Sequence, residues 1–197
     1  MPRAGLSPQL VADLALAVVD EHGPDALTLA AVAQRAGVAV PSLYKHVAGL
    51  PALRAAVALH CVDELADVMA GALDGRSSSE ALVALAHALR RHALAHPGRY
   101  AAAQSDWVRE PSAELLVAGA RAVGVARAAV AALGVPPDRQ VDAVRAVRAT
   151  LHGFVSLELA GGFGMPDDVD VSFDFLVAGL VEALVAAGAG TARPVVG

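Results

Sequence analysis

Three adjacent side chains near the start of the chain, Tyr44, Lys45 and His46, could together bind a phosphate backbone. A phenol hydroxyl and an imidazole N–H can donate to phosphate oxygens, and an ammonium group can neutralise phosphate charge. The triplet stands between the apolar residues Leu43 and Val47, which are four positions apart and would face inward on a helix. The spacing therefore predicts a short helix that packs on one side and offers the other side to a polyanion.

Two short helices joined by a tight turn are predicted over residues 28–47. Thr28 precedes an apolar stripe, and its hydroxyl can accept a hydrogen bond from a free N–H of the first helical turn. Gly37 stands where a left-handed residue would end that helix at no steric cost. Pro41 suits the first turn of the second helix because its missing N–H is not needed there. This is the local chemistry of a helix-turn-helix unit.

These residues resemble the DNA-binding unit of the TetR family of transcriptional repressors. The resemblance is carried by Thr28-Leu29, the run Ala31 to Val38, and Pro41 to Val47, while Ser7 to Gly23 fits the first helix of that family. It implies an all-α fold with an N-terminal three-helix helix-turn-helix DNA-binding domain over residues 1–50. A C-terminal helical ligand-binding and dimerisation domain would follow over residues 51–190. The implied partners are a palindromic double-stranded DNA operator, a small-molecule effector and a second copy of the chain.

In the family, the tyrosine and its neighbours contact phosphates and base edges of an operator. The resemblance therefore assigns DNA contacts to Thr28, Ser42, Tyr44, Lys45 and His46. Their hydroxyl, ammonium and imidazole groups are of the kinds that bind phosphate or base edges. Four alternatives stay open, and the first is that Lys45 is an ordinary surface lysine. Tyr44 can plug the helix pair, His46 can pack against the next helix, and Thr28 can act as a cap alone.

Net charge weighs against DNA binding. The whole chain carries −5, and its first fifty residues hold three basic residues, Arg3, Arg35 and Lys45, against four acidic ones. Phosphate neutralisation supplies most non-specific DNA affinity, so a basic face is the usual signature. In addition, Gly49-Leu50-Pro51 stands where members of the family commonly carry a lysine. We expect a dimer with modest affinity and a shallow salt dependence.

The remainder of the chain is predicted to be helical, because no alternating strand pattern of useful length occurs. Expected helices span residues 50–73, 77–95, 111–133, 138–159 and 171–187, with a less regular piece over 99–110 and a loop over 161–170. A second resemblance, to the WHG-type C-terminal domain of one TetR subgroup, is carried by Leu151-His152-Gly153-Phe154, Leu157-Glu158, Gly162-Phe163 and Ser172-Phe173. That subgroup usually has Trp where Leu151 stands.

The last two predicted helices carry more apolar residues than one chain can easily cover. A helix that is apolar nearly all round must be buried, and a terminal helix has few internal neighbours. A four-helix interface with a second copy would cover the excess, as in the TetR family, and would set two reading helices about 34–36 Å apart. The predicted interface residues are Leu151, Val155, Phe175, Leu176, Leu180 and Leu184. A deep intramolecular core is the alternative.

The resemblance implies that the middle of the chain, residues 77–133, senses a small hydrophobic molecule. Binding would shift the spacing of the two reading heads and release the repressor from its operator. The candidate pocket residues are His87, His92, Tyr100, Trp107 and Phe154. A structural role is the alternative for each of them, since His87 and His92 can lie on a solvated helix face and Trp107 can belong to the core.

Membrane and secreted proteins fit the composition poorly. The chain is 56% hydrophobic with a mean hydropathy of +0.53, but Arg121, Arg127 and Glu182 interrupt the longest apolar runs. No membrane span is therefore expected. No basic-then-apolar leader is apparent, so we expect a cytoplasmic protein. A single cysteine, Cys61, excludes an internal disulfide.

Enzymatic functions lack their motifs. His92 and His96, four residues apart on one predicted helix, could share a metal, but no HExxH glutamate lies between them. His60, Cys61 and Asp63 could form a nucleophilic site, although helical spacing puts Cys61 in an apolar stripe. We expect no catalytic residue, no cofactor and no metal site. A small-molecule-binding helical bundle without DNA affinity and a metal-assisted hydrolase are the alternatives to a DNA-binding repressor.

Overall fold

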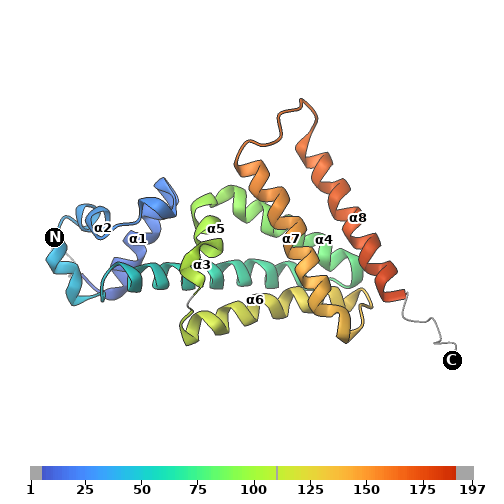
Figure 1. The fold of residues 1–197 in the computed structure, drawn as a ribbon, viewed down its shortest axis with the longest axis horizontal. Helices are drawn as coiled ribbons and strands as arrows, with labels where there is room; N and C mark the ends of the chain where they lie inside the picture. The colour runs from blue at the N-terminus through green and yellow to red at the C-terminus, as the bar shows by residue number, and fades with distance from the viewer. Residues whose placement is uncertain (1–5, 110, 190–197) are drawn as a thin grey trace. The chain divides into compact units, whose positions relative to one another are not determined.

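The computed structural model describes residues 6–109 and 111–189 (Figure 1). Helices make up 81% of the chain and the described residues contain no strand, which confirms the predicted all-α fold. The α-helices are α1 (Pro8–His22), α2 (Leu29–Ala36), α3 (Leu50–Leu73), α4 (Ser78–Ala95), α5 (Pro97–Gln104), α6 (Ala113–Ala132), α7 (Gln140–Leu159) and α8 (Val169–Ala189). Short 3-10 helices are η1 (Pro24–Ala26), η2 (Val40–Lys45), η3 (Asp106–Val108) and η4 (Pro137–Arg139).

Local capping chemistry sets several helix ends. Gly23 follows α1 with φ +79°, a conformation that favours glycine. Before α6, the Ser112 hydroxyl accepts a hydrogen bond from the Leu115 N–H at 3.2 Å. The helix therefore begins at Ala113, two residues later than the predicted start at Pro111.

The stretch after α4 differs from its prediction. The sequence predicts a less regular piece over residues 99–110, whereas residues 97–104 form α5 and residues 106–108 form η3. Pro97 suits the first turn of α5 because a proline has no N–H to leave unpaired there. After the helix, the Ser105 hydroxyl donates to the Ala102 carbonyl at 2.7 Å. A helix of 8 residues shows too little periodicity to be recognised from sequence.

Packing divides the chain into two compact units, and each unit combines segments that are distant in sequence. The first unit contains residues up to 65 together with residues 95–119, and the second contains residues 66–94 together with those from 120 onward. The predicted domain boundary at residue 50 follows the helix-turn-helix motif alone and stays a prediction. In the structure, the first part of α3 and the whole of α5 join the unit that contains this motif.

A single apolar core holds the first unit together. α1 supplies the largest share, α2, η2 and α3 add to it, and α5 contributes its small residues. The buried members are Val11, Ala15, Leu16, Val18, Val19, Leu27, Val32, Ala33, Leu43, Leu53, Val57, Cys61, Ala102 and Ala103. Trp107 of η3 packs against this core. Burying one Val or Leu side chain is worth about 1.5–3 kcal/mol, so apolar packing gives the unit its cohesion.

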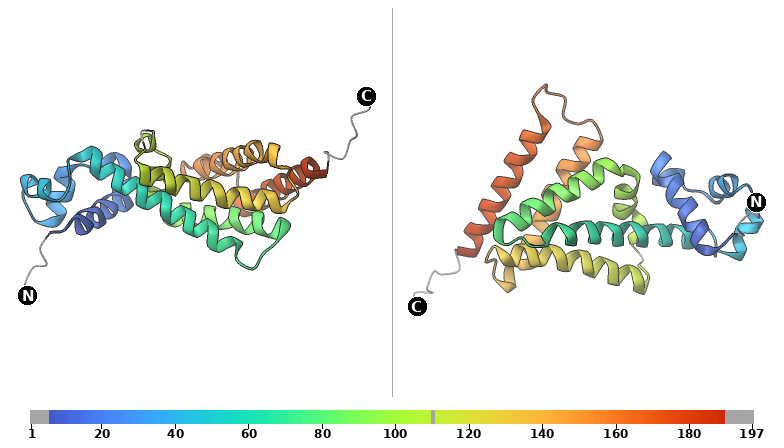
Figure 2. Two further views of the ribbon diagram at one scale, coloured as in Figure 1. Left: turned by 90° about the horizontal axis from the view of Figure 1, so that it is seen from below. Right: turned by 180° about the vertical axis from the view of Figure 1, so that it is seen from behind.

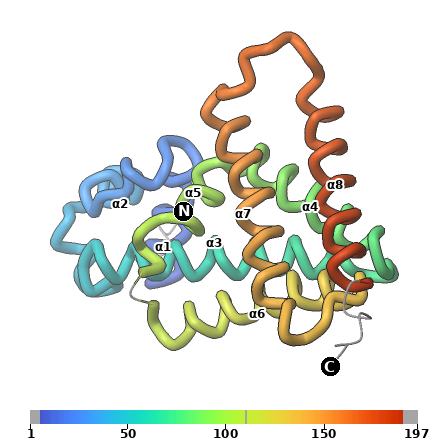
Figure 3. Tube along the Cα trace, turned by 45° about the vertical axis from the view of Figure 1, so that its right-hand side comes forward, coloured from blue at the N-terminus to red at the C-terminus, as the bar shows by residue number. Residues whose placement is uncertain are grey.

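α5 lies beside α1 (Figure 3), and only glycine fits where the two helices touch. A Cβ added at Gly98 would lie 2.0 Å from the Val19 carbonyl oxygen and 2.8 Å from the Val19 carbonyl carbon. These are backbone atoms of a helix, so they cannot rotate away as the end of a side chain could. The contact therefore fixes how near the two helix backbones lie.

In the second unit, α7 and α8 run in opposite directions and residues 160–168 join them (Figure 1, Figure 2). The core of this unit includes Leu82, Leu85, Val130, Leu151, Val155, Phe173, Val177 and Leu184. Three residues predicted at an interface between copies are thus buried within one chain: Leu151, Val155 and Leu184 are 1%, 0% and 6% exposed. The apolar pattern of α7 and α8 predicted that much of their surface must be buried. It did not show which side of each helix packs within its own chain.

Two helices, α6 and α8, are long and apolar enough to cross a membrane by length and composition alone, with mean hydropathies of 1.6 and 1.8. Only 28% and 22% of these apolar windows are buried inside the structure. Large apolar side chains are exposed on both helices, among them Leu116, Val117 and Phe175. Exposed apolar faces of this size are typical of surfaces that bind a partner.

Gly98→Ala is expected to destabilise the first unit by about 1–3 kcal/mol, because the added methyl group would push the α1 and α5 backbones apart. Gly119→Ala is the matched control. Nothing lies within 4 Å of a Cβ added at Gly119, so alanine should leave stability unchanged or raise it slightly. Urea unfolding followed by circular dichroism measures both variants, and equal stabilities would contradict the close approach.

Candidate nucleic-acid interface

The turn between α2 and η2 has the geometry that its residue types predict. The Thr28 hydroxyl accepts a hydrogen bond from a backbone N–H three residues on, at 3.1 Å, and so caps α2. Gly37 follows α2 in the left-handed conformation, with φ +68°. Its N–H donates to the Gln34 carbonyl at 3.1 Å, and the Val38 N–H donates to the Ala33 carbonyl at 3.0 Å. These two bonds form a Schellman motif.

The segment after the turn, η2, is a short 3-10 helix. The Ser42 N–H donates to the Ala39 carbonyl at 2.9 Å, and the His46 N–H donates to the Leu43 carbonyl at 2.8 Å, each reaching three residues back. Leu43 is fully buried, while its neighbour Tyr44 is 60% exposed. The inward leucine therefore anchors η2 to the core and turns the next residue outward.

The predicted DNA contacts lie on the outer side of this motif. Thr28, Tyr44 and Lys45 are exposed, and Ser42 and His46 are half-buried. Tyr44 does not plug the helix pair, because most of its side chain faces solvent. We call the outward part of η2 formed by Tyr44 and Lys45 the reading edge.

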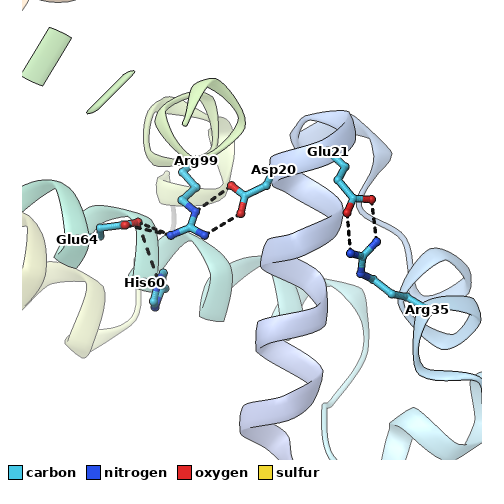
Figure 4. A network of polar contacts seen from close by, with 6 residues as sticks. All are labelled: Asp20, Glu21, Arg35, His60, Glu64 and Arg99. Atoms are coloured by element: carbon cyan, nitrogen blue, oxygen red, sulfur yellow. Dashed lines mark hydrogen bonds and ion pairs between the residues drawn. The ribbon is translucent and has the colours of Figure 1, made fainter. Parts of the chain in front are cut away.

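The helix-turn-helix segment carries two basic residues, Arg35 and Lys45, which differ in their ion pairing. Arg35 binds the Glu21 carboxylate of α1 through two parallel hydrogen bonds of 2.7 and 2.6 Å (Figure 4). The hydrogen bonds from Arg35 lower the pKa of Glu21. Lys45 makes no ion pair or side-chain hydrogen bond with any residue in 6–109 or 111–189. Within this segment, the lysine on the reading edge is therefore the cation available to a phosphate.

The acidic residue beside Glu21 is neutralised as well. Asp20 accepts two hydrogen bonds from Arg99 of α5, of 2.8 and 2.7 Å, and these bonds lower the pKa of the Asp20 carboxyl (Figure 4). Two of the four acidic residues that weighed against DNA binding are thus held in ion pairs with arginines.

The predicted pocket residues belong to different units. Tyr100 is 3% exposed in the first unit, and Trp107 packs against the apolar core of that unit. Their burial and packing are compatible with a structural role, and their place in a pocket stays a prediction. His87, His92 and Phe154 belong to the second unit.

His87 and Phe154 both pack against the ring of Phe173 of α8. The ring centroids of His87 and Phe173 are 5.3 Å apart, and those of Phe154 and Phe173 are 5.1 Å apart. Phe163 adds a further contact, with its centroid 4.7 Å from that of Phe154. The Arg90 guanidinium lies 4.8 Å from the centroid of Phe173. We call these five side chains the aromatic cluster.

The sequence did not predict that Arg90 belongs to this cluster. Arg90 is only 8% exposed, and its guanidinium donates to Glu158 at 2.8 and 2.6 Å and to Asp170 at 2.7 Å. These hydrogen bonds raise the pKa of Arg90, so it stays charged although it is buried. The partners lie 68 and 80 positions along the chain, beyond the reach of any local pattern.

The candidates for enzyme chemistry do not form a site. Cys61 is 1% exposed, and burial raises the pKa of its thiol to about 12, so it is an uncharged packing group at neutral pH. Residues 6–109 and 111–189 contain no group of three His, Cys, Asp or Glu side chains placed to hold a metal ion.

A capped helix, a Schellman turn and a short helix with an outward tyrosine and lysine are the parts of a helix-turn-helix DNA-binding protein. Family comparison identifies the class further. The profile of bacterial regulatory proteins of the tetR family matches residues 11–47, and that of the tetracyclin repressor-like C-terminal domain matches residues 82–180. The chain belongs to the TetR family of transcriptional regulators.

Individual relatives are similar to this chain over most of its length. It is 30% identical over 185 residues to the uncharacterized HTH-type transcriptional regulator YobS of Bacillus subtilis, covering 93% of this chain and 95% of the relative. It is 33% identical over 172 residues to the uncharacterized HTH-type regulator Rv0681 of Mycobacterium tuberculosis, covering 87% and 78%. The crystal structure of regulatory protein SCO4313 is similar, with a TM-score of 0.74 at 27% identity, over 89% and 95% of the two chains. The protein is a DNA-binding transcriptional regulator and not an enzyme.

Glu21→Gln should strengthen binding to any DNA duplex, because it releases the Arg35 guanidinium and removes a negative charge from the unit that carries the reading edge. One additional phosphate contact would steepen the slope of log affinity against log salt by about one. Asp25→Asn is the matched control, since Asp25 is exposed in η1 and its removal frees no cation. Fluorescence anisotropy with a random-sequence duplex at several salt concentrations gives both slopes. Equal slopes for the two variants would mean that Arg35 does not reach DNA.

Proposed function

We propose that this regulator is a repressor that binds a palindromic operator as a homodimer and is released by a small hydrophobic molecule. The observation that carries the proposal is the exposure pattern of η2, where Leu43 is fully buried and Tyr44 is 60% exposed. A buried anchor beside an exposed phenol and a lysine with no ion pair among the described residues is suited to a DNA backbone. Since a bacterial regulator must reach DNA inside the cell, we also infer a cytoplasmic location.

The DNA contacts are divided by chemistry. The Tyr44 hydroxyl donates to a phosphate, and the Lys45 ammonium binds a phosphate or a base edge. Ser42 and His46 are half-buried, so they support the reading edge and reach phosphates beside it. Thr28 already caps α2 with its hydroxyl, which can still donate its own hydrogen to a phosphate.

Dimerisation rests on the exposed apolar faces of α7 and α8. Leu157, Val171 and Phe175 are 53%, 65% and 83% exposed. Gly153 and Gly179 have nothing within 4 Å of an added Cβ, so another helix could approach their backbones closely. Of the interface residues predicted from sequence, Phe175, Leu176 and Leu180 have exposed or half-buried side chains and remain in the proposal. Two copies joined here would offer two reading edges to successive major grooves.

We assign effector sensing to the second unit, around the aromatic cluster. Its rings, packed edge-to-face or tilted, combine apolar groups with one charged arginine, the usual composition of a small-molecule site. His87, Phe154 and the nearby α4 residue His92 are the proposed lining residues. A full reversal of operator occupancy needs an effector that prefers the DNA-incompetent dimer by about 5.5 kcal/mol.

Tyr44→Ala tests the reading edge. It should weaken binding by more than about tenfold to a duplex enriched by the wild-type protein from a random-sequence library, because a phosphate contact is lost. Tyr44→Phe should lose most of this affinity if the hydroxyl is the donor. Met165→Ala, which shortens a side chain 78% exposed in the loop between α7 and α8, is the control. Gel-shift titration measures the three, and unchanged affinity of a folded Tyr44→Ala protein would refute the assignment.

Phe175→Asp tests the dimer. A carboxylate placed at the centre of the apolar α7–α8 face would be buried without a partner, so the variant should be monomeric at micromolar concentration. Met165→Asp introduces the same charge at a similarly exposed apolar position outside the helices and should stay dimeric. Sedimentation equilibrium distinguishes the states. A monomeric wild-type protein, or a dimeric Phe175→Asp protein, would contradict the proposed interface.

A further inference from the structure

Arg99 of α5 joins three helices of the first unit in one ion-pair network (Figure 4). Its Nε and Nη2 donate to the two carboxylate oxygens of Asp20 on α1 at 2.8 and 2.7 Å. Its Nη1 donates to both oxygens of Glu64 on α3 at 2.9 and 3.1 Å. A single guanidinium thus binds two carboxylates that come from different helices.

This network is better shielded than the other pairs on α1. The side chains of Arg99, Asp20 and Glu64 are 22%, 29% and 27% exposed, whereas those of Arg35 and Glu21 are 37% and 47% exposed. Partial burial and a two-sided fork geometry make charge-assisted hydrogen bonds stronger and more directional than those of an open surface pair. Removing the guanidinium would deprive both carboxylates of their arginine partner and leave Glu64 with His60, whose Nε2 lies 4.0 Å from it.

A backbone contact, which does not depend on charge, also places α5 against α1. The residue before Arg99 is Gly98, whose Cα leaves room for no Cβ against the Val19 carbonyl oxygen. Backbone contact and ion pair therefore act on the same turn of α1, at the consecutive residues Val19 and Asp20.

Two adjacent carboxylates in the last turn of α1 bind arginines from two different helices. Asp20 binds Arg99 of α5, and Glu21 binds Arg35 of α2 (Figure 4). α2 in turn packs on η2, which carries the reading edge. A displacement of α1 relative to α5 would therefore be passed to α2 and η2 through directional contacts as well as through the apolar core.

We propose that Arg99 is a positioning residue for DNA recognition. By binding Asp20 and Glu64 together it fixes α1 against α3 and α5, and thereby sets the orientation in which the reading edge meets DNA. Arg99 itself touches no DNA. This inference rests on the proposed reading edge, and it adds a residue that lies far along the chain from the helix-turn-helix segment.

The test uses the full-length protein and two duplexes, one enriched by the wild-type protein from a random-sequence library and one of shuffled sequence. Arg99→Gln should weaken binding to the enriched duplex by about tenfold or more, while its affinity for the shuffled duplex stays within about twofold of wild type. Arg99→Lys should fall between, because an ammonium keeps the charge but cannot form the fork. Arg139→Gln removes an exposed pair with Asp142 in the second unit and should leave both affinities unchanged.

Other outcomes would overturn the proposal. Equal losses on both duplexes, with a salt slope reduced by about one, would make Arg99 a direct phosphate contact. A lowered unfolding temperature with unchanged affinities well below that temperature would make its role purely structural. Should Arg99→Gln fail to fold, Arg99→Lys is judged by the same criteria.

Amide hydrogen exchange tests the positioning role without DNA. Arg99→Gln should speed exchange in α1 and α2 at least severalfold and leave α7 unchanged, because only the first unit loses the network. Unchanged exchange in α2 would overturn the proposal. A wild-type protein that enriches no duplex would instead contradict the proposed reading edge, so the two failures are distinguishable.

Discussion

Two adjacent carboxylates at the end of α1 give the DNA-reading unit its orientation, because each binds a guanidinium from a different helix. Asp20 binds Arg99, and Glu21 binds Arg35. The apolar core supplies cohesion, but apolar contact has little directional preference and would tolerate small rotations of one helix on another. Paired hydrogen bonds between planar groups do not tolerate such rotations. The close contact at Gly98 limits the remaining freedom, because the α5 backbone cannot approach α1 any further.

The same carboxylates explain how an acidic chain can read DNA. A count over the first fifty residues gives more acids than bases, which argues against a polyanion as partner. The structure shows that Asp20 and Glu21 face neighbouring helices, where arginines neutralise them, while Lys45 has no such pair among the described residues. A phosphate responds to the field at the reading edge, which falls off within about 10 Å in salt, and not to the charge of the whole domain.

Local chemistry made part of this structure predictable from sequence. The Thr28 cap, the Gly37 turn and the buried Leu43 beside an exposed Tyr44 depend on residues within a few positions of one another, and each was predicted. Arg99 and Arg90 were not, because their carboxylate partners lie 35 to 80 positions away and no periodicity connects them. The assignment of α5 to the reading unit was missed for the same reason. Its contact with α1 is tertiary, and the sequence signals it only by a glycine next to an arginine.

The apolar residues of α7 and α8 also show that tertiary contacts cannot be predicted from local sequence. Periodicity predicted more apolar surface on these helices than one chain covers easily, yet Leu151, Val155 and Leu184 fill the core of the second unit while Phe175 stays 83% exposed. What selects the buried side is the aromatic cluster, where Phe173 is fully buried and Asp170, three residues earlier, binds Arg90. Together these two contacts fix the rotation of α8 about its own axis. A rotation that buried Phe175 instead would expose Phe173 and break the ion pair between Arg90 and Asp170, while Glu158 of α7 would stay bound to Arg90. The burial of Phe173 and the Arg90–Asp170 pair therefore leave the Phe175 face free for the second copy that we propose.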